Sequence, residues 1–145
     1  MTKGEAAKCF FKTGLNCSQA VAAAFADEIN MDKETVIRLT LGFGGGMGRM
    51  REVCGAVSGM TFVISAVYGN EDKGKVYESV QAVAEEFRKA NGSIVCRELL
   101  GLTSKGADSP IPCERTNEYY KKRPCPELVA MCADILDEYL KNHPV

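Results

Sequence analysis

Hydrophobic residues recur at helical spacing along most of the chain, and no segment alternates between apolar and polar positions as a half-buried strand does. Glycine, proline and cap residues divide this pattern into segments. About six or seven helices are predicted, in segments 5–12, 17–29, 33–41, 54–68, 73–91, 93–100 and 126–142. The sequence therefore predicts an all-α fold.

The segment 54–68 is apolar on nearly every side, which is typical of a buried central helix. The segments 73–91 and 126–142 each carry one apolar stripe, as helices that cover such a core do. A chain of 145 residues with 46% hydrophobic residues can bury a core of its own. We expect a compact helical bundle and a single domain over residues 1–145.

The hexapeptide CGAVSG at 54–59 begins this central helix. Gly55 and Gly59 are four residues apart, so they lie on one face of the helix. Small residues at this spacing let a second helix approach closely. We expect a close helix crossing there.

A glycine run at 42–48 cannot be a stable helix interior, because each glycine costs about 1 kcal/mol there relative to alanine. The run either brings backbone close to a ligand or allows a tight chain crossing. Neither nucleotide-binding glycine pattern matches it. The residues predicted to shape or contact a ligand site are Gly44, Gly45, Gly46, Gly48 and Arg49.

Four of the seven cysteines lie where a predicted helix begins, namely Cys17, Cys54, Cys96 and Cys125. Backbone N–H groups and the helix dipole favour a thiolate at this position. Cys54 also follows Arg49 and Arg51, whose positive charges lower the pKa of a nearby thiol. We expect lowered pKa values, with Cys54 as the nucleophile or central ligand and Cys132 as inert core.

These cysteines and the hexapeptide CGAVSG resemble the C_GCAxxG_C_C family of proteins described as redox-active. The resemblance spans nearly the whole chain and implies redox activity or a bound prosthetic group. A related domain occurs in split-Soret cytochromes. This chain has no CxxCH haem-attachment motif, and its one histidine, His143, lies near the C-terminus.

Three hypotheses for the cysteines remain open. Four thiolates can hold an iron–sulfur cluster or a zinc ion, in which case the protein is a metal-binding module. Two pairs can instead cycle between dithiol and disulfide with an unknown redox partner. In the third hypothesis the cysteines are reduced core residues of a helical interaction domain. No local CxxC motif decides between them.

The irregular segment 102–124 contains three prolines and is long for a loop in a compact domain. Loops of this length cover a functional site or move. Cys113 lies within it and approaches the other cysteines only if the segment folds over them.

The formal net charge of −1 excludes the strong excess of basic residues that is typical of nucleic-acid-binding domains. The most apolar segment has about 15 residues, below the length of a membrane span. No secretory pattern is evident at the N-terminus, so we expect a reducing cytoplasm. The apolar surface of segment 54–68 also predicts a homodimer.

Overall fold

The computed structural model describes residues 1–102, 106–112, 114–115 and 124–145. The helices in chain order are α1 (Lys3–Lys12), α2 (Cys17–Ala23), α3 (Lys33–Thr40), the 3-10 turn η1 (Leu41–Phe43), α4 (Gly44–Met47), α5 (Gly55–Tyr68), α6 (Lys73–Asn91), α7 (Cys96–Leu99) and α9 (Cys125–Asn142). Within these ranges the only β-pairing is an isolated antiparallel bridge between Val53 and Val95. The predicted all-α fold is confirmed.

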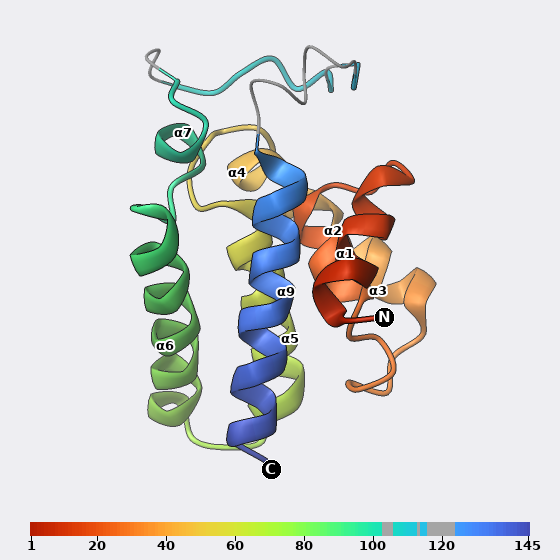
Figure 1. Cartoon of the computed structure of the whole chain (residues 1–145), viewed down its shortest axis with the longest axis vertical. Helices are drawn as coiled ribbons and strands as arrows, with labels where there is room; N and C mark the ends of the chain where they lie inside the picture. Colours follow the sequence, from red (N-terminus) through yellow and green to blue (C-terminus); the bar gives the residue numbers. More distant parts are fainter. Residues whose placement is uncertain (103–105, 113, 116–123) are drawn as a thin grey trace.

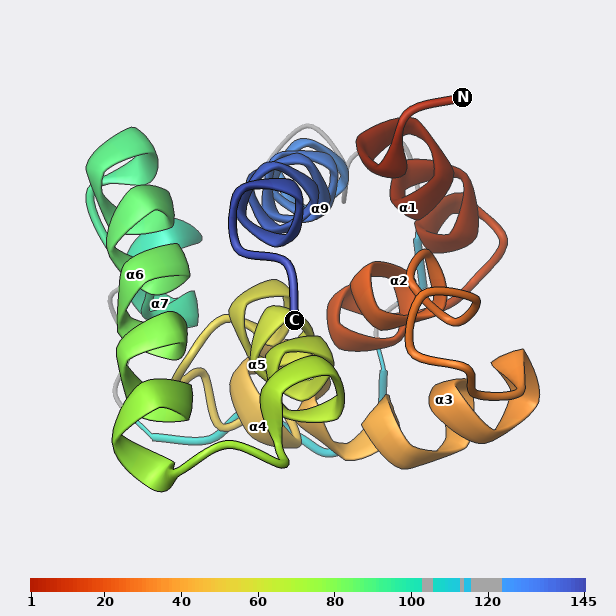
Figure 2. The ribbon, with the colours of Figure 1, turned by 90° about the horizontal axis from the view of Figure 1, so that it is seen from below.

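The long helices α5, α6 and α9 run side by side, and α1, α2 and α3 lie against one flank of this group (Figures 1 and 2). The helix α5 packs against α2, α6 and α9. Its residues Met60, Val63 and Ile64 are completely buried. One side of α5 is less covered, since Phe62 is half-buried and Ser65 is exposed. The central helix is thus buried on most sides but not on all.

The close crossing predicted from Gly55 and Gly59 lies between α5 and α2. A Cβ atom added at Gly59 would stand 2.8 Å from the carbonyl oxygen of Ser18 and 3.1 Å from the Cβ of Val21. A side chain there would push α2 away from α5. Glycine at this position therefore lets Cys17, the first residue of α2, approach the start of α5.

Two predicted helices are shorter than expected. The segment 17–29 is helical only to Ala23, because Phe25 and Ala26 donate backbone hydrogen bonds three rather than four residues back, to Ala22 and Ala23. The segment 93–100 forms only the single turn α7, since the bridge at Val95 keeps the preceding residues extended.

The glycine run forms a left-handed turn. Five consecutive residues, 45–49, have positive φ angles, as does Arg51. Glycine tolerates this conformation, whereas Met47 and Arg49 each carry a cost of about 1–2 kcal/mol. Main-chain hydrogen bonds close the turn, from the Gly48 N–H to the Gly42 carbonyl at 2.9 Å and from the Glu52 N–H to the Gly46 carbonyl at 2.9 Å. The turn carries the chain from α3 back to the start of α5.

In the part of the chain that the structure describes, none of the helices combines the length and the apolar character needed to cross a bilayer.

Candidate thiol site

Each of the four cysteines singled out above stands at a helix N-terminus. Cys17, Cys96 and Cys125 are the first residues of α2, α7 and α9, and Cys54 is the N-cap of α5. These helix ends meet at one end of the bundle (Figure 1). All four cysteines line one cavity of about 60 Å³, which we call the thiol cavity.

Asn16 fixes the position of Cys17. Its Oδ1 accepts a hydrogen bond from the backbone N–H of Gln19 at 3.0 Å, which caps α2. Its Nδ2 donates to the carbonyl of Leu41 at 2.9 Å, which ties the cap to the chain just before the glycine turn. The cap thereby joins two elements that border the thiol cavity.

A short backbone pairing fixes Cys54 and Cys96. The N–H of Cys54 donates to the carbonyl of Ile94 at 2.8 Å, and the N–H of Cys96 donates to the carbonyl of Glu52 at 2.6 Å. Gly46 lies against this pair, because a Cβ atom there would stand 2.7 Å from the Cβ of Cys96. Only glycine fits between the turn and Cys96.

Cys17 and Cys125 are direct neighbours whose side chains form a hydrogen bond. This bond is the largest cause that raises the pKa of Cys17 well above its usual range, followed by burial and by the charges of the other three cysteines. A hydrogen bond that raises the pKa of a thiol favours its protonated form. Cys17 is therefore held in its protonated form within this pair.

Cys54 is almost completely buried, and burial raises its pKa to about 12. The backbone N–H groups of Ala56 and Val57 lower this pKa, as expected at a helix start, but burial outweighs them. The prediction that helix-start placement lowers the thiol pKa is therefore wrong for Cys17 and Cys54. At Cys54 desolvation of the thiolate is the main cause, and at Cys17 the hydrogen bond with Cys125 is the main cause, followed by burial.

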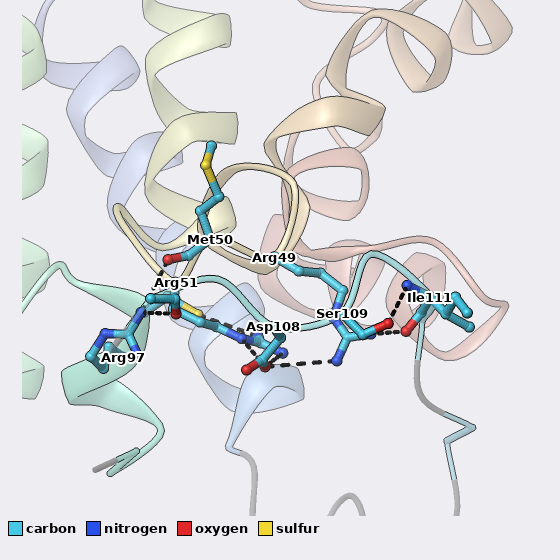
Figure 3. Close-up of polar contacts among 9 residues, drawn as sticks. Arg49, Met50, Arg51, Arg97, Asp108, Ser109 and Ile111 are labelled. Carbon is cyan, nitrogen blue, oxygen red and sulfur yellow. Dashed lines mark hydrogen bonds and ion pairs between the residues drawn. The ribbon is translucent and has the colours of Figure 1, made fainter. Parts of the chain in front are cut away.

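The two arginines that precede Cys54 in sequence contact other groups. Arg51 is 5% exposed, and its Nη1 lies 3.6 Å from the Sγ of Cys96. Its Nε and Nη2 both lie 2.8 Å from Oδ2 of Asp108. Arg49 approaches the same carboxylate, with Nη2 at 3.7 Å from Oδ2 (Figure 3). The left-handed turn thus directs the guanidinium group of Arg51 to Cys96, whereas the sequence predicted that the arginines act on Cys54.

The glycines and the arginine predicted to shape or contact a ligand site line two different cavities. Gly45 and Gly46 line the thiol cavity. Gly44, Gly45, Gly48 and Arg49 line a second cavity of about 320 Å³, which we call the outer cavity. The two cavities share four lining residues: Asn16, Gly45, Arg51 and Arg115.

Sequence reasoning missed Asp108 and Arg115. Both lie in the irregular segment before α9, where no helical spacing relates them to the cysteines. The one available signal was that both are charged residues within a segment expected to cover a site. Cys132 is buried as expected, Cys9 is exposed, and Cys113 lies outside the described residues.

Four cysteine sulfurs are a suitable ligand set for zinc or an iron–sulfur cluster. Among the described residues, however, no group of three or more His, Cys, Asp or Glu side chains is arranged to hold a metal ion. As placed, the four thiols do not fit a metal centre.

A family model described as "Putative redox-active protein (C_GCAxxG_C_C)" matches residues 15–139. The match includes all four cysteines of the thiol cavity. No curated protein and no solved structure matches the chain.

Proposed function

Because the chain belongs to the C_GCAxxG_C_C family, whose members are described as redox-active, we propose that it is a thiol oxidoreductase that cycles Cys17 and Cys125 between dithiol and disulfide. Its function would be to reduce a disulfide substrate and to be reduced again by an external dithiol.

The hydrogen bond between Cys17 and Cys125 is the observation that carries this proposal. It brings together two sulfurs that are 108 positions apart in the sequence. Both cysteines are half-buried and keep part of their surface open, whereas Cys54 and Cys96 are buried. An incoming disulfide therefore has better access to the first pair than to the second.

The raised pKa of Cys17 supports a role for each sulfur. Because Cys17 holds its proton, Cys125 is the sulfur of the pair that acts as the attacking thiolate. The first residue of α9 also faces backbone N–H groups and the positive end of the helix dipole. Cys17, which holds its proton, then serves as the resolving thiol.

The reaction proceeds in two exchanges. The Cys125 thiolate, after its proton passes to solvent, attacks one sulfur of the substrate, whose S–S bond breaks and releases a thiolate that takes up a proton. Cys17 then loses its proton and attacks the Cys125 sulfur of the mixed disulfide, which releases the second substrate thiol. Two electrons and two protons leave the protein dithiol, so one disulfide yields two thiols.

This chemistry suits a reducing compartment such as the cytoplasm, where a dithiol donor keeps the pair reduced. The hypothesis of a metal or iron–sulfur module is tested separately by metal analysis and by the absorption spectrum of anaerobically purified protein. A visible band with bound iron, or one stoichiometric zinc ion lost in the Cys17→Ser variant, would replace the proposal with that module.

Single-turnover thiol release tests the proposal. The exposed Cys9 and Cys113, which lies outside the described residues, are first replaced by serine in all proteins. Reduced protein is then mixed anaerobically with one equivalent of 2-hydroxyethyl disulfide, and released thiol is counted. We expect about two thiols per chain from this background protein.

The two single variants of the pair are expected to differ. Cys17→Ser should release one thiol and retain a mixed disulfide on Cys125, and Cys125→Ser should release almost none. A Cys125→Ser protein that still releases two thiols would contradict the proposal, as would two thiols from Cys17→Ser.

A further inference from the structure

We infer that the outer cavity is a binding site for a small organic anion, and that the disulfide substrate of the thiol cavity carries a carboxylate or similar anionic group. The assignment of the substrate class rests on the proposed function. The assignment of the anion site does not, because it follows from the charge and shape of the outer cavity.

The outer cavity is large enough for a small molecule and is continuous with the thiols. Its volume of about 320 Å³ lies in the usual range of ligand pockets. It shares Asn16, Gly45, Arg51 and Arg115 with the thiol cavity. A ligand in the outer cavity therefore contacts the same residues that border the cysteines.

Three arginines, Arg49, Arg51 and Arg115, line the outer cavity, in a chain whose formal net charge is −1. Asp108 contacts Arg49 and Arg51 and offsets one of these charges (Figure 3). Among the described residues, the lining of the cavity holds these three cations and no carboxylate. Low-dielectric walls around such a cluster attract anions.

Among the described residues, Arg115 carries the clearest uncompensated charge. Its Nη1 donates to the carbonyl of Phe11 at 2.5 Å and its Nη2 to the carbonyl of Leu15 at 2.7 Å. Its guanidinium lies 4.1 Å from the centroid of the Phe11 ring. In the described part of the chain its partners are all neutral, so they orient the guanidinium without cancelling its charge.

The planar guanidinium group pairs with carboxylates through two parallel hydrogen bonds. The glycines of the left-handed turn add no side chains to the floor of the cavity, so a ligand can reach the backbone. An anionic group held here would direct the rest of the molecule across the shared wall, toward Cys17 and Cys125.

Calorimetry with suberate tests binding without thiol chemistry. Suberate is the analogue of 3,3′-dithiodipropionate in which two methylenes replace the two sulfurs. The cationic counterpart is 1,6-diaminohexane, which replaces cystamine in the same way. We expect suberate to bind, the diamine not to bind, and added salt to weaken suberate binding. Absence of suberate binding, or equal binding of both compounds, would overturn the inference.

Variants of Arg49 locate the site, because Arg49 lines the outer cavity but, unlike Arg115, does not line the thiol cavity. Arg49→Gln should weaken suberate binding about tenfold, the effect of losing one charge-assisted hydrogen bond. Arg49→Lys should retain most of the affinity for suberate. This result would show that the loss in Arg49→Gln comes from the missing charge and not from misfolding. The control Arg88→Gln, on the exposed face of α6, should not change it. An equal loss in Arg88→Gln would contradict the assignment.

Reduction rates then test the substrate class. The protein should reduce 3,3′-dithiodipropionate faster than neutral 2-hydroxyethyl disulfide, and cystamine most slowly, with this order lost in Arg49→Gln. If suberate binds but none of the three is reduced, the proposed function fails and the anion site stands. If all three are reduced at equal rates and suberate does not bind, the anion site fails and the proposed function stands.

Discussion

The chemistry of the individual cysteines follows from burial more than from helix position. Backbone N–H groups at a helix start do lower the pKa of Cys54, yet its burial has the larger effect. Cys17 also keeps its proton, chiefly through the hydrogen bond to Cys125. Thiols of this kind stay uncharged at neutral pH and require a neighbouring sulfur or a substrate to become reactive.

The raised pKa of Cys54 makes the stability of the fold depend on alkaline pH. In the unfolded chain this thiol ionises near its ordinary pKa of about 8.5, whereas in the folded chain it stays protonated until about pH 12. The unfolded state therefore holds fewer protons between these values, and the free energy of unfolding falls as the pH rises through this window.

Chemical denaturation at pH 7 to 11 measures this effect. We expect a nearly constant free energy of unfolding below pH 8 and a decrease above pH 9, with a smaller slope in Cys54→Ala than in the native chain. The exposed Cys9 supplies the control, since Cys9→Ala should keep the native slope. An identical slope in Cys54→Ala and the native protein would contradict the account.

At the scale of elements, the left-handed turn determines which groups meet in the site. It turns the chain sharply after η1 and places Arg51 beside Cys96. Gly46 is the critical position, since a side chain there would overlap Cys96, whereas a Cβ atom at Gly48 meets no atom within 4 Å. Both glycines have positive φ angles, so alanine strains the backbone similarly at either position.

A comparison of alanine at Gly46 with alanine at Gly48 separates the cost of backbone strain from the cost of steric overlap. Gly48→Ala should lower the free energy of unfolding by about 1–2 kcal/mol. Gly46→Ala should lower it by about a further 1–3 kcal/mol, because the added methyl displaces Cys96 or the turn. Urea denaturation of both variants checks this difference. Equal losses would show that Gly46 is not confined by Cys96.

Several of these elements could be predicted from the sequence. Local signals define the starts of α2 and α9, because Asn16 is a good cap and Pro126 suits the first turn. The spacing of Gly55 and Gly59 predicted a close crossing, although not that α2 was the partner. These features depend on residues that are neighbours in the sequence.

Other features depend on contacts between distant residues and could not be predicted. The raised pKa of Cys54 results from burial by several helices, which a local pattern does not report. The contact of Arg51 with Cys96 requires the left-handed turn. The salt bridge from Asp108 joins a segment without regular structure to that turn, so no periodicity indicated it.

At the scale of the whole molecule, one face of the bundle remains apolar. A groove of about 550 Å³ runs between α4, α5 and α6 and is lined by Phe43, Met47, Val53, Val57 and Phe62, among others. Phe43, Met47 and Val53 are each more than one-third exposed. We retain the homodimer as a proposal, in which a second copy covers this groove.

Light scattering at micromolar concentration measures the assembly. We expect about twice the chain mass of 15.7 kDa for the native protein. Val53→Lys should shift the mass toward that of one chain, because it places a charge in the groove. Tyr77→Lys changes an exposed residue on α6 outside the groove and should leave the dimer intact. A native mass near 15.7 kDa would show that the groove remains open.

The central claim, that Cys17 and Cys125 form a reversible disulfide, is tested most directly by mapping the bond. Reduced protein is oxidised anaerobically with one equivalent of 2-hydroxyethyl disulfide, alkylated, digested and analysed by mass spectrometry. The account predicts one dominant intramolecular link, between the peptides that contain Cys17 and Cys125, which disappears on treatment with dithiothreitol. A dominant link between Cys54 and Cys96, or alkylation of both Cys17 and Cys125 after oxidation, would contradict it.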